Sequence, residues 1–464
     1  MNFDALDTLI RQQMRKRKTP GLAIAVTKDD RVIYSKGFGA RNLKQYLPMT
    51  ADTLIGIGSV TKSFTAMAVV RLQEMGLLSI EDSVSKYLEV EPFASRPEIK
   101  IKHMLSHSSG IPTMDGANNS FHYAFDDFSR VYPAESREDF LAHLGDAGDF
   151  IIYKPGEHFF YNNDCYTCLT FIIEDLTGKS FEAFLREVVL EPLAMKRAVM
   201  NQADFDNDPE NNMMTGYLPD VKDGKPAVKA SAMPMAGWVQ APGGIYASMN
   251  EMIHYAQCLL NSGAYGGQQV VEAASVTQLF APQMATPYGR GDDPQYSLGW
   301  CRSGRTAQIP HEVIGHGGGM LTSSSNFVLV PELNLGIVVA ENCSTGICPL
   351  VTDAVIATVL GDNPAEVIED LRIAQAIDDI EGVYMSAHDM YSFRVYREGG
   401  VIKVDAEIDD GFESFTLVGC DIDTLVFSRY SLREDNKSRI EFLRNEGSGK
   451  VEYVTYDRYL YRRC

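Results

Sequence analysis

The 464-residue chain has no stretch of about 18 or more apolar residues, the length at which a segment is interpreted as a membrane-spanning helix. Its first residues, MNFDALDTLI, begin with acidic side chains and lack the basic start and unbroken apolar run of an export signal. Leu6, Leu9 and Ile10 follow helical spacing, so we expect an amphipathic surface helix there. The sequence predicts a cytoplasmic protein without a membrane partner.

Positive charge is also scarce. The chain has 42 Lys and Arg against 62 Asp and Glu, a formal net charge of −20. Nucleic-acid binding needs a basic surface that neutralises phosphates, so a nucleic-acid partner is excluded. The acidity fits a soluble protein with cationic or neutral substrates, although charge alone selects none. We expect a small-molecule or short-peptide substrate.

Cysteine is present but is not arranged for redox chemistry. Of the eight cysteines, Cys165 and Cys168 form a C-x-x-C pair. A redox pair of this kind follows a strand, whereas this pair leads into an apolar helical run. We expect packed, reduced thiols, as in a cytoplasm.

Two familiar catalytic motifs are incomplete. TGKS at residues 177–180 lacks the earlier glycine of a phosphate-binding loop, since Ile173 occupies that position. Ser180 is expected to cap a helix instead. HGGG at residues 316–319 resembles the oxyanion loop of α/β-hydrolase esterases, but the chain has no G-x-S-x-G nucleophile motif. A P-loop enzyme and an α/β-hydrolase are therefore excluded.

Metal ligation is not indicated either. His103 and His107 are spaced to share one face of a helix, but Met104 stands where the zinc-protease motif has glutamate. We predict no metal and no other cofactor.

The patterning of the first 360 residues predicts an α+β architecture. Strand patterns occur near both ends of this region, and the middle, from about residue 100 to 235, is mostly helical and loop. Chain-distant strands are therefore expected to converge on one sheet. The expected elements are two strands in residues 21–39, a helix in 59–78, a surface insertion at 113–136, a glycine turn and helix in 241–263, and two strands in 317–342.

A change in composition at residues 361–371 marks a domain boundary, so we predict domains at residues 1–362 and 363–464. In VIKVDAEI, residues 401–408, apolar side chains alternate with polar ones, as in a strand with one buried face. Several short segments of this kind predict a small β-sheet or barrel at the C-terminus.

The strongest candidate chemistry lies in GIGSVTKSFT, residues 56–65. Ser59 and Lys62 are three positions apart, so on a helix the hydroxyl and the amine lie on one face. Burial at a helix N-terminus disfavours the ammonium form and leaves Lys62 able to accept a proton. Taken alone, the short motif favours the ordinary interpretation, a capping serine and a solvated lysine, by about ten to one.

Two later motifs favour the catalytic interpretation. Tyr161-x-Asn163 follows about a hundred residues downstream, and His316-x-Gly318 precedes a strand. A sequence of S-x-x-K, a short polar triplet and a basic residue before glycine is the order found in penicillin-recognising serine enzymes.

On these motifs the sequence resembles the serine β-lactamase-related hydrolases, in particular class C β-lactamases, D-stereospecific peptidases and CubicO-type esterases. The resemblance covers roughly residues 8–360 and includes PGLAIAV, IKHMLSHSSGIP and APGGIYASMNEMIHY. It implies a β-lactamase/transpeptidase-like antiparallel sheet flanked by helices, with a helical subdomain and the active site between them.

The resemblance also implies roles for single residues. Ser59 matches the acylated nucleophile, and Lys62 with Tyr161 matches the pair that removes its proton. Asn163 matches the amide that hydrogen-bonds the lysine and the substrate. His316 and Gly318 occupy the strand beside the substrate, and the backbone N–H groups of Ser59 and Gly319 match the oxyanion hole. His107 matches a family segment but is interpreted as structural.

One departure affects the expected activity. Histidine at position 316 replaces the lysine that many β-lactamases use to hold the carboxylate of the drug, and neutral histidine attracts a carboxylate less. We therefore expect a serine hydrolase acting through an acyl-enzyme on small amides, D-amino-acid peptides or esters. The alternatives are a weak β-lactamase and a catalytically idle penicillin-binding or sensor-like protein that retains the fold.

The C-terminal hundred residues resemble the β-barrel tail of some members, which is lipocalin-like in a few. Such tails cap the active site or mediate oligomers, so the resemblance implies a homo-oligomer formed through residues 363–464.

Overall fold

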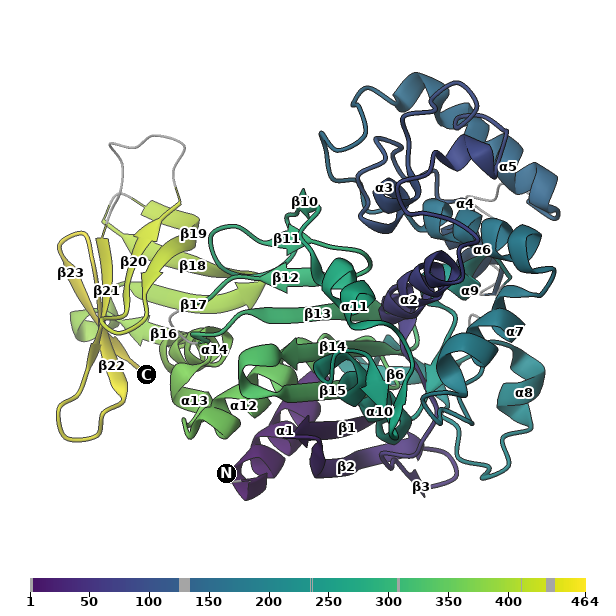
Figure 1. Ribbon diagram of the computed structural model, residues 1–464. Helices are drawn as coiled ribbons and strands as arrows, with labels where there is room; N and C mark the ends of the chain where they lie inside the picture. Colours follow the sequence, from purple (N-terminus) through teal and green to yellow (C-terminus); the bar gives the residue numbers. More distant parts are fainter. Residues whose placement is uncertain are drawn as a thin grey trace. The chain divides into compact units, whose positions relative to one another are not determined.

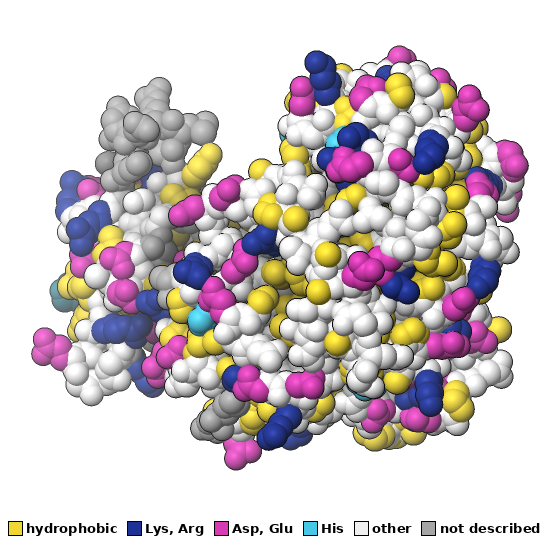
Figure 2. All heavy atoms as spheres, viewed as in Figure 1, with side chains coloured by type: hydrophobic (Ala, Val, Ile, Leu, Met, Phe, Trp, Pro, Cys, Tyr) yellow, Lys and Arg dark blue, Asp and Glu magenta, His cyan; other side chains and the backbone are white. Residues whose placement is uncertain are grey.

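The computed structural model describes residues 3–124, 134–233, 235, 237–306, 309–409, 411–430 and 439–464 (Figure 1). The chain divides into two compact units, Met1–Ile356 and Ala357–Cys464. On the face drawn in Figure 2, acidic and basic side chains are interspersed, so the excess acidic charge is not gathered into one patch there. No helix in the described residues has both the length and the apolar character needed to cross a membrane.

The first unit is built on a nine-stranded sheet in the order β10-β11-β12-β13-β14-β15-β1-β2-β3. All neighbours are antiparallel, and β15 pairs with β1 so that Leu22 lies opposite Glu341. The expected convergence of chain-distant strands is confirmed. The strands are β1 (Gly21–Lys28), β2 (Arg31–Asn42), β3 (Leu47–Pro48), β10 (Met284–Ala285), β11 (Gln295–Tyr296), β12 (Cys301–Ser303), β13 (Val313–Gly319), β14 (Ser324–Val330) and β15 (Leu335–Glu341).

Helices cover both faces of this sheet. On β14, the ring of Phe327 contacts Tyr255 of α10 (Met249–Leu260), whereas the next side chain back, Asn326, donates to Thr352 of α12 (Cys348–Leu360). Adjacent residues of a strand point to opposite faces, so α10 and α12 cover different faces. The helix α1 (Phe3–Arg17) contacts β2 through Asp7, and α2 (Thr61–Glu74) and α11 (Ala273–Phe280) complete the layers.

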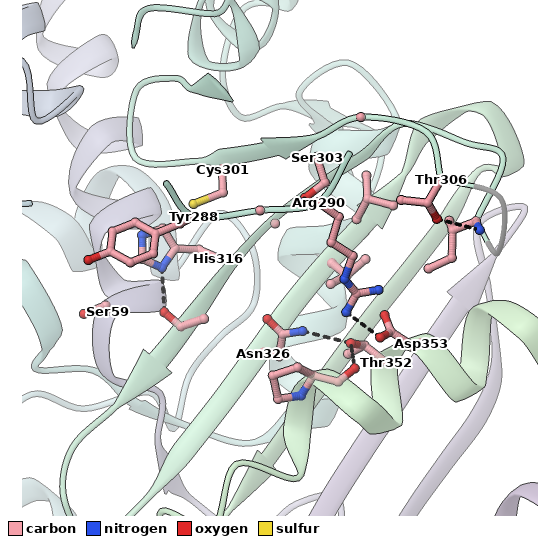
Figure 3. Close-up of a pocket in the computed structure, with 18 of the residues that line it drawn as sticks. Ser59, Tyr288, Arg290, Cys301, Ser303, Thr306, His316, Asn326, Thr352 and Asp353 are labelled. Carbon is pink, nitrogen blue, oxygen red and sulfur yellow. Dashed lines mark hydrogen bonds and ion pairs between the residues drawn. The ribbon is translucent and has the colours of Figure 1, made fainter. Parts of the chain in front are cut away.

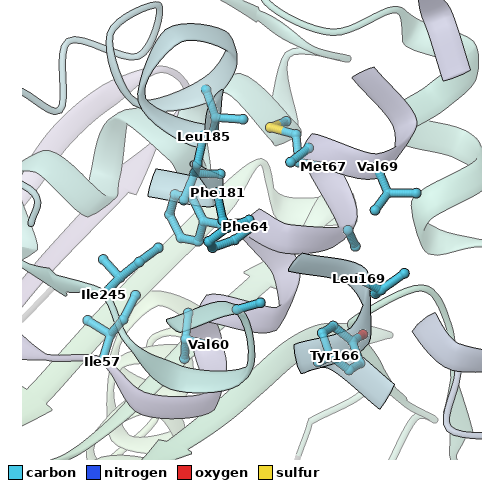
Figure 4. Packing of buried hydrophobic residues seen from close by; sticks show 14 of the residues in the cluster. Ile57, Val60, Phe64, Met67, Val69, Tyr166, Leu169, Phe181, Leu185 and Ile245 are labelled. Carbon is cyan, nitrogen blue, oxygen red and sulfur yellow. The ribbon is translucent and has the colours of Figure 1, made fainter. Parts of the chain in front are cut away.

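A helical subdomain, at the upper right of Figure 1, faces α2. Tyr166 and Leu169 of α6 join Phe64 and Met67 of α2 in one apolar cluster (Figure 4). Its helices are α3 (Ile101–Leu105), α4 (Gly116–Ala124), α5 (Arg137–Gly145), α6 (Asn163–Thr177) and α7 (Phe181–Leu185). The remaining short elements of the unit are β4 (Ile55–Gly56), β5 (Gly216–Lys222), β6 (Lys225–Ser231), β7 (Tyr246–Ala247), β8 (Ala264–Tyr265), β9 (Gln268–Gln269), α8 (Gln202–Asp206) and α9 (Gln240–Gly243).

Local expectations here have mixed outcomes. Ser180 caps α7 by accepting a hydrogen bond from a backbone N–H, as predicted. The shared helix face of His103 and His107 was wrong, because α3 ends at Leu105 and His107 has a left-handed φ of 56°. The predicted insertion at 113–136 contains α4, and residues 125–133 of it lie outside the described residues.

The second unit contains a closed eight-stranded barrel in which consecutive strands are neighbours and β16 pairs with β23. The predicted all-β C-terminal domain is confirmed, and this up-and-down closure is the lipocalin-like arrangement, which leaves no exposed edge. Two helices precede the barrel. The elements are α13 (Pro364–Val367), α14 (Glu369–Ile380), β16 (Gly382–Met385), β17 (Ser392–Glu398), β18 (Val401–Ile408), β19 (Gly411–Asp421), β20 (Val426–Arg429), β21 (Arg439–Arg444), β22 (Val451–Tyr456) and β23 (Tyr459–Arg463).

Substituting Gly58 tests how closely the end of β13 packs against the turn before α2. Gly58 has φ of 52°, and a Cβ atom there would lie 2.6 Å from the Gly319 nitrogen, whereas Gly76 has φ of 73° and open space. Both alanine variants incur left-handed strain, so Gly76→Ala should lower the unfolding free energy by about 1 kcal/mol and Gly58→Ala by about 3 kcal/mol. Urea unfolding measures both, and equal losses would contradict the close contact.

Candidate active site

Ser59 lies in a 3₁₀ turn, η1 (Gly58–Val60), immediately before α2. The sequence predicted Ser59 on the helix itself, whereas α2 begins at Thr61 and Lys62 lies in its first turn. Ser59 is half-buried and Lys62 is completely buried. The hydroxyl therefore faces accessible space while the amine behind it does not.

The segment before the nucleophile is held by the turn that joins β13 to β14. Ser323 Oγ donates to the carbonyl of Gly56 at 2.9 Å, and Ser325 Oγ donates to that of Ile57 at 2.7 Å. A Cβ atom on Gly318 would lie 1.9 Å from the Ile57 oxygen, so only glycine permits this approach. The geometry gives Gly318 a packing role beside the site.

The start of α2 is held from its other side by the loop around α9. Ile245 donates its backbone N–H to Thr61 Oγ1 at 3.2 Å, and Thr65 Oγ1 donates to the Ala241 carbonyl at 2.8 Å. These hydroxyls satisfy backbone groups that would otherwise be buried without partners. This segment, residues 241–245 (APGGI, the APGGI loop), therefore fixes the turn of α2 that carries Lys62.

The amine of Lys62 lies between the nucleophile and this loop. Nζ is 3.1 Å from Ser59 Oγ and donates to the Pro242 carbonyl at 2.8 Å. It also lies 4.7 Å from the ring centre of Tyr161 and 5.4 Å from that of Tyr166. Burial lowers the pKa of Lys62 well below its usual 10.5, so the amine favours its neutral, proton-accepting form.

Tyr161 is the third group at the nucleophile. Burial raises the pKa of Tyr161, and its hydrogen bond with Ser59 opposes that rise without overcoming it. The phenol therefore stays protonated at neutral pH and can donate a hydrogen bond or a proton. The buried amine and the buried phenol have pKa shifts of opposite direction, so a group biased toward its unprotonated form and a group biased toward its protonated form both lie beside Ser59.

The residue after Tyr161 anchors it. Asn162 is buried, and its Nδ2 donates to the carbonyls of Ile111 and Pro112 at 3.0 Å each. Its backbone N–H donates to His107 Nδ1 at 3.1 Å, and the His107 ring lies 4.3 Å from that of Tyr161. Asn162 was not singled out from the sequence, although an asparagine directly before an apolar helical run is a helix-cap signal.

Asn163 does not make the contact that the family resemblance implies. Its Nδ2 donates to Asn118 Oδ1 at 2.8 Å, and its own Oδ1 is buried without a hydrogen-bond partner. The Lys62 amine therefore does not donate to Asn163. The side chain is turned toward α4, and its unpaired oxygen is the atom left for a ligand.

His316 is neutral and held at both ring nitrogens. Nδ1 lies 2.6 Å from the Gly317 carbonyl, which can only accept, so Nδ1 carries the proton. Nε2 therefore accepts from the Tyr296 hydroxyl at 2.9 Å. Burial and the nearby Lys62 lower the pKa of His316 to about 3. Position 316 supplies no positive charge near neutral pH.

A cavity of about 460 Å³ opens at Ser59 (Figure 3). His316 lines it near the serine, and Arg290 and Asp353 line it farther along. Tyr161, which hydrogen-bonds Ser59, also lines the cavity. The sequence offered no signal for Arg290, a single arginine in an irregular segment. In the described part of the chain, no group of three or more His, Cys, Asp or Glu side chains is arranged to hold a metal ion.

Residues 6–362 match the Beta-lactamase family. The chain belongs to this family. Residues 364–462 match the Pab87 octamerisation domain. The family consists of serine hydrolases and penicillin-binding relatives. The sequence analysis expected membership from three motifs in order, S-x-x-K, Tyr161-x-Asn163 and His316-x-Gly318.

Known relatives agree with this placement. The octameric penicillin-binding protein homologue from Pyrococcus abyssi matches 99% of this chain and 100% of its own, with a TM-score of 0.86 and 28% identity. Protein flp of Staphylococcus aureus strain MW2 is 25% identical over 351 residues, which are 74% of this chain but 64% of flp. The D-amino acid amidase from Ochrobactrum anthropi SV3, complexed with L-phenylalanine, is 17% identical, with a TM-score of 0.62. The match covers 78% of this chain and 99% of the amidase chain, and at this identity it shows a shared fold alone.

The buried lysine of this Beta-lactamase family member should leave a pH signature in stability. Because burial lowers the pKa of Lys62, the unfolded chain binds a proton that the folded chain lacks between the folded pKa and 10.5. Stability therefore rises with pH across that window. Lys62→Met removes this contribution, so the variant should be the more stable protein at neutral pH and should lose its advantage as pH approaches 10.5. Urea unfolding across pH measures this, and Lys44→Met, at an exposed position, is the control that should leave the slope unchanged.

The neutral state of His316 is testable by NMR. With a pKa lowered to about 3, its ring resonances should not shift between pH 5 and 8. His316→Gln identifies the resonance by its disappearance. If the resonance that His316→Gln removes titrates within that range, the buried neutral imidazole is contradicted.

Proposed function

We propose that the protein is a serine hydrolase that works through a covalent acyl-enzyme at Ser59. The observation that carries the proposal is the completely buried Lys62 amine, 3.1 Å from Ser59 Oγ and biased by burial toward its neutral form. A serine hydroxyl is a weak nucleophile until a neighbouring base accepts its proton, and this amine is such a base.

In the acylation step, Ser59 Oγ attacks the substrate carbonyl carbon while its proton passes to Lys62 Nζ. The carbonyl oxygen gains negative charge, which the backbone N–H groups of Ser59 and Gly319 are proposed to stabilise. The protonated phenol of Tyr161 then gives its proton to the leaving group as the carbon–leaving-group bond breaks. Proton transfer from Lys62 to Tyr161 restores both groups, and their ring-to-amine distance of 4.7 Å places them side by side.

Deacylation uses the same groups in reverse. Water replaces the leaving group, neutral Lys62 accepts one of its protons while the protonated Tyr161 phenol remains a hydrogen-bond donor, and the hydroxide adds to the acyl carbon. Collapse of the second intermediate returns the proton to Ser59. Asn163 is assigned to the substrate, because its buried and unpaired Oδ1 can accept a hydrogen bond from an amide N–H.

We assign small amides, short peptides containing D-amino acids, and esters as the substrate class. A D-amino acid amidase has the same fold, which supports amide cleavage at this type of site. The neutral His316 disfavours efficient β-lactam hydrolysis, since no charge stands there to hold the carboxylate of the drug. The proposed β-lactamase activity is therefore weak.

We also propose a homo-oligomer formed through the barrel unit. Residues 364–462 match an octamerisation domain, and the Pyrococcus abyssi homologue that matches the whole chain is octameric. Light scattering of the full chain and of a chain ending at residue 362 tests this, and equal masses per chain would contradict it.

Covalent labelling tests the acyl-enzyme directly. A fluorophosphonate and a labelled penicillin should modify Ser59, because the nucleophile and its base lie within hydrogen-bonding distance. Mass spectrometry of a digest locates the adduct. Ser59→Ala should take up no label, and Ser63→Ala, which changes a buried serine on the same helix, should still be labelled.

Turnover assays on the same two proteins, wild type and Ser59→Ala, distinguish an enzyme from a catalytically idle binding protein. Hydrolysis of D-alanine amides or short esters by the wild-type chain, lost in Ser59→Ala, supports the proposal. Labelling of both proteins alike would contradict it, and a permanent adduct without any turnover would favour the penicillin-binding alternative.

A further inference from the structure

The cavity at Ser59 continues well past the reacting groups. Ser59 and His316 line one end, while Ser303, Thr306 and Asp353 line the other (Figure 3). None of the residues at the second end takes part in the proposed chemistry. The cavity volume of about 460 Å³ lies within the range of ligand sites.

Strand β13 sets the length of this cavity. Its Gly318–Gly319 end contacts the turn that carries Ser59, and Val313, which lines the cavity, lies four residues before Gly317. Four strand residues correspond to about 13 Å. Ser303 pairs with Val313, and its Oγ accepts the backbone N–H of Arg290 at 3.1 Å, which fixes Arg290 at the far end.

Gly317 keeps the two ends connected. A Cβ atom there would meet nothing closer than 3.9 Å, and its φ is not left-handed, so the backbone would accept a side chain. By contrast, a Cβ on Gly315 would lie 2.5 Å from the Phe327 carbonyl. Glycine at 315 is thus explained by strand packing, whereas glycine at 317 leaves space beside Asn326, which also lines the cavity.

The far end carries the charged groups of the cavity. Arg290 forms an ion pair with Asp353; the arginine side chain is 43% exposed and the aspartate side chain 13%. The guanidinium is thus the more accessible partner. Among the residues that line the cavity, Arg290 is the basic one, because His316 is neutral and its ring nitrogens are already bonded.

We propose that the far end of the cavity is a subsite for a substrate carboxylate, which Arg290 binds while Ser59 acts on a carbonyl about four residues of extended chain away. The guanidinium is suited to this role because its planar N–H groups match a carboxylate, and Asp353 holds it in orientation. This proposal rests on the proposed function, because it assumes that the substrate reacts with Ser59 at the other end of the cavity. It narrows the substrate class to acidic chains with their carboxylate remote from the scissile bond.

Binding to a Ser59→Ala protein tests the subsite without requiring turnover. The probes are N-acetylated alanine peptides of increasing length, in D and L forms, each as the free acid and as the carboxamide. We expect the acid to bind more tightly than the amide by about 10- to 100-fold once the chain spans the cavity. Peptides with an N-succinyl group and an amidated C-terminus place the carboxylate on the opposite side of the scissile bond and distinguish the two orientations.

Variants assign the effect to Arg290. In the Ser59→Ala background, Arg290→Gln combined with Asp353→Asn replaces the ion pair by two neutral side chains and should reduce the affinity for the acid to that for the amide. Arg305→Gln, at an exposed arginine of the same region that pairs with Glu332, should retain the preference. Gly317→Val should also remove the preference, since its side chain occupies the passage while Arg290 is intact.

Equal binding of acid and amide to Ser59→Ala at every length, or a preference that survives the Arg290 and Asp353 double change, would overturn the subsite. The subsite would also be overturned if the protein bound peptides with a free amine more tightly than the acids and if Asp353→Asn abolished that preference. The Arg290–Asp353 end of the cavity would then be assigned to a cationic group. Failure of Ser59 labelling contradicts only the proposed function, because the binding comparison does not depend on catalysis.

Discussion

The burial of the Lys62 amine against Ser59 is the constraint on which the rest of the site depends. A charged amine without a carboxylate partner is costly in a desolvated interior, so burial favours the neutral base. The surroundings give this amine only the Pro242 carbonyl, the Ser59 hydroxyl and two aromatic rings. Its base strength is thus a property of the whole packed core, and the fold gives up some stability to maintain it.

Three segments that are remote in the chain create this environment. The β13–β14 turn holds the residues before Ser59, the APGGI loop holds the start of α2, and Asn162 fixes Tyr161 beside them. Most of these contacts are hydrogen bonds from side chains to backbone carbonyls, which resist small displacements because each broken bond leaves a buried polar group. A nucleophile on a short 3₁₀ turn thereby acquires the rigidity of the sheet.

Much of the fold was predictable because its signals are local. Alternating apolar residues and turn residues marked β1, β2, β14 and β15, and the spacing of Ser59 and Lys62 placed both on one short segment. The partners of individual side chains were not predictable, because they depend on rotamers and on loops from elsewhere in the chain. Asn163 turns to Asn118, the Tyr296 hydroxyl donates a hydrogen bond to His316 Nε2, and His107 has a left-handed backbone beyond the end of α3. Arg290 belongs to no periodic pattern, so only the cavity reveals it.

The neutrality of His316 and the remote position of Arg290 have one physical explanation. A permanent positive charge at position 316 would lie close enough to Lys62 for the two to interact, as the lowering of the His316 pKa by Lys62 already indicates. An arginine farther along the cavity, oriented by Asp353, is proposed to bind the substrate carboxylate through its more accessible guanidinium without that repulsion. A substrate carboxylate bound beside Lys62 would instead raise the pKa of the amine and favour its ammonium form, which cannot accept the Ser59 proton. Placing the recognition charge away from Lys62 therefore leaves burial as the influence that lowers the pKa of the amine.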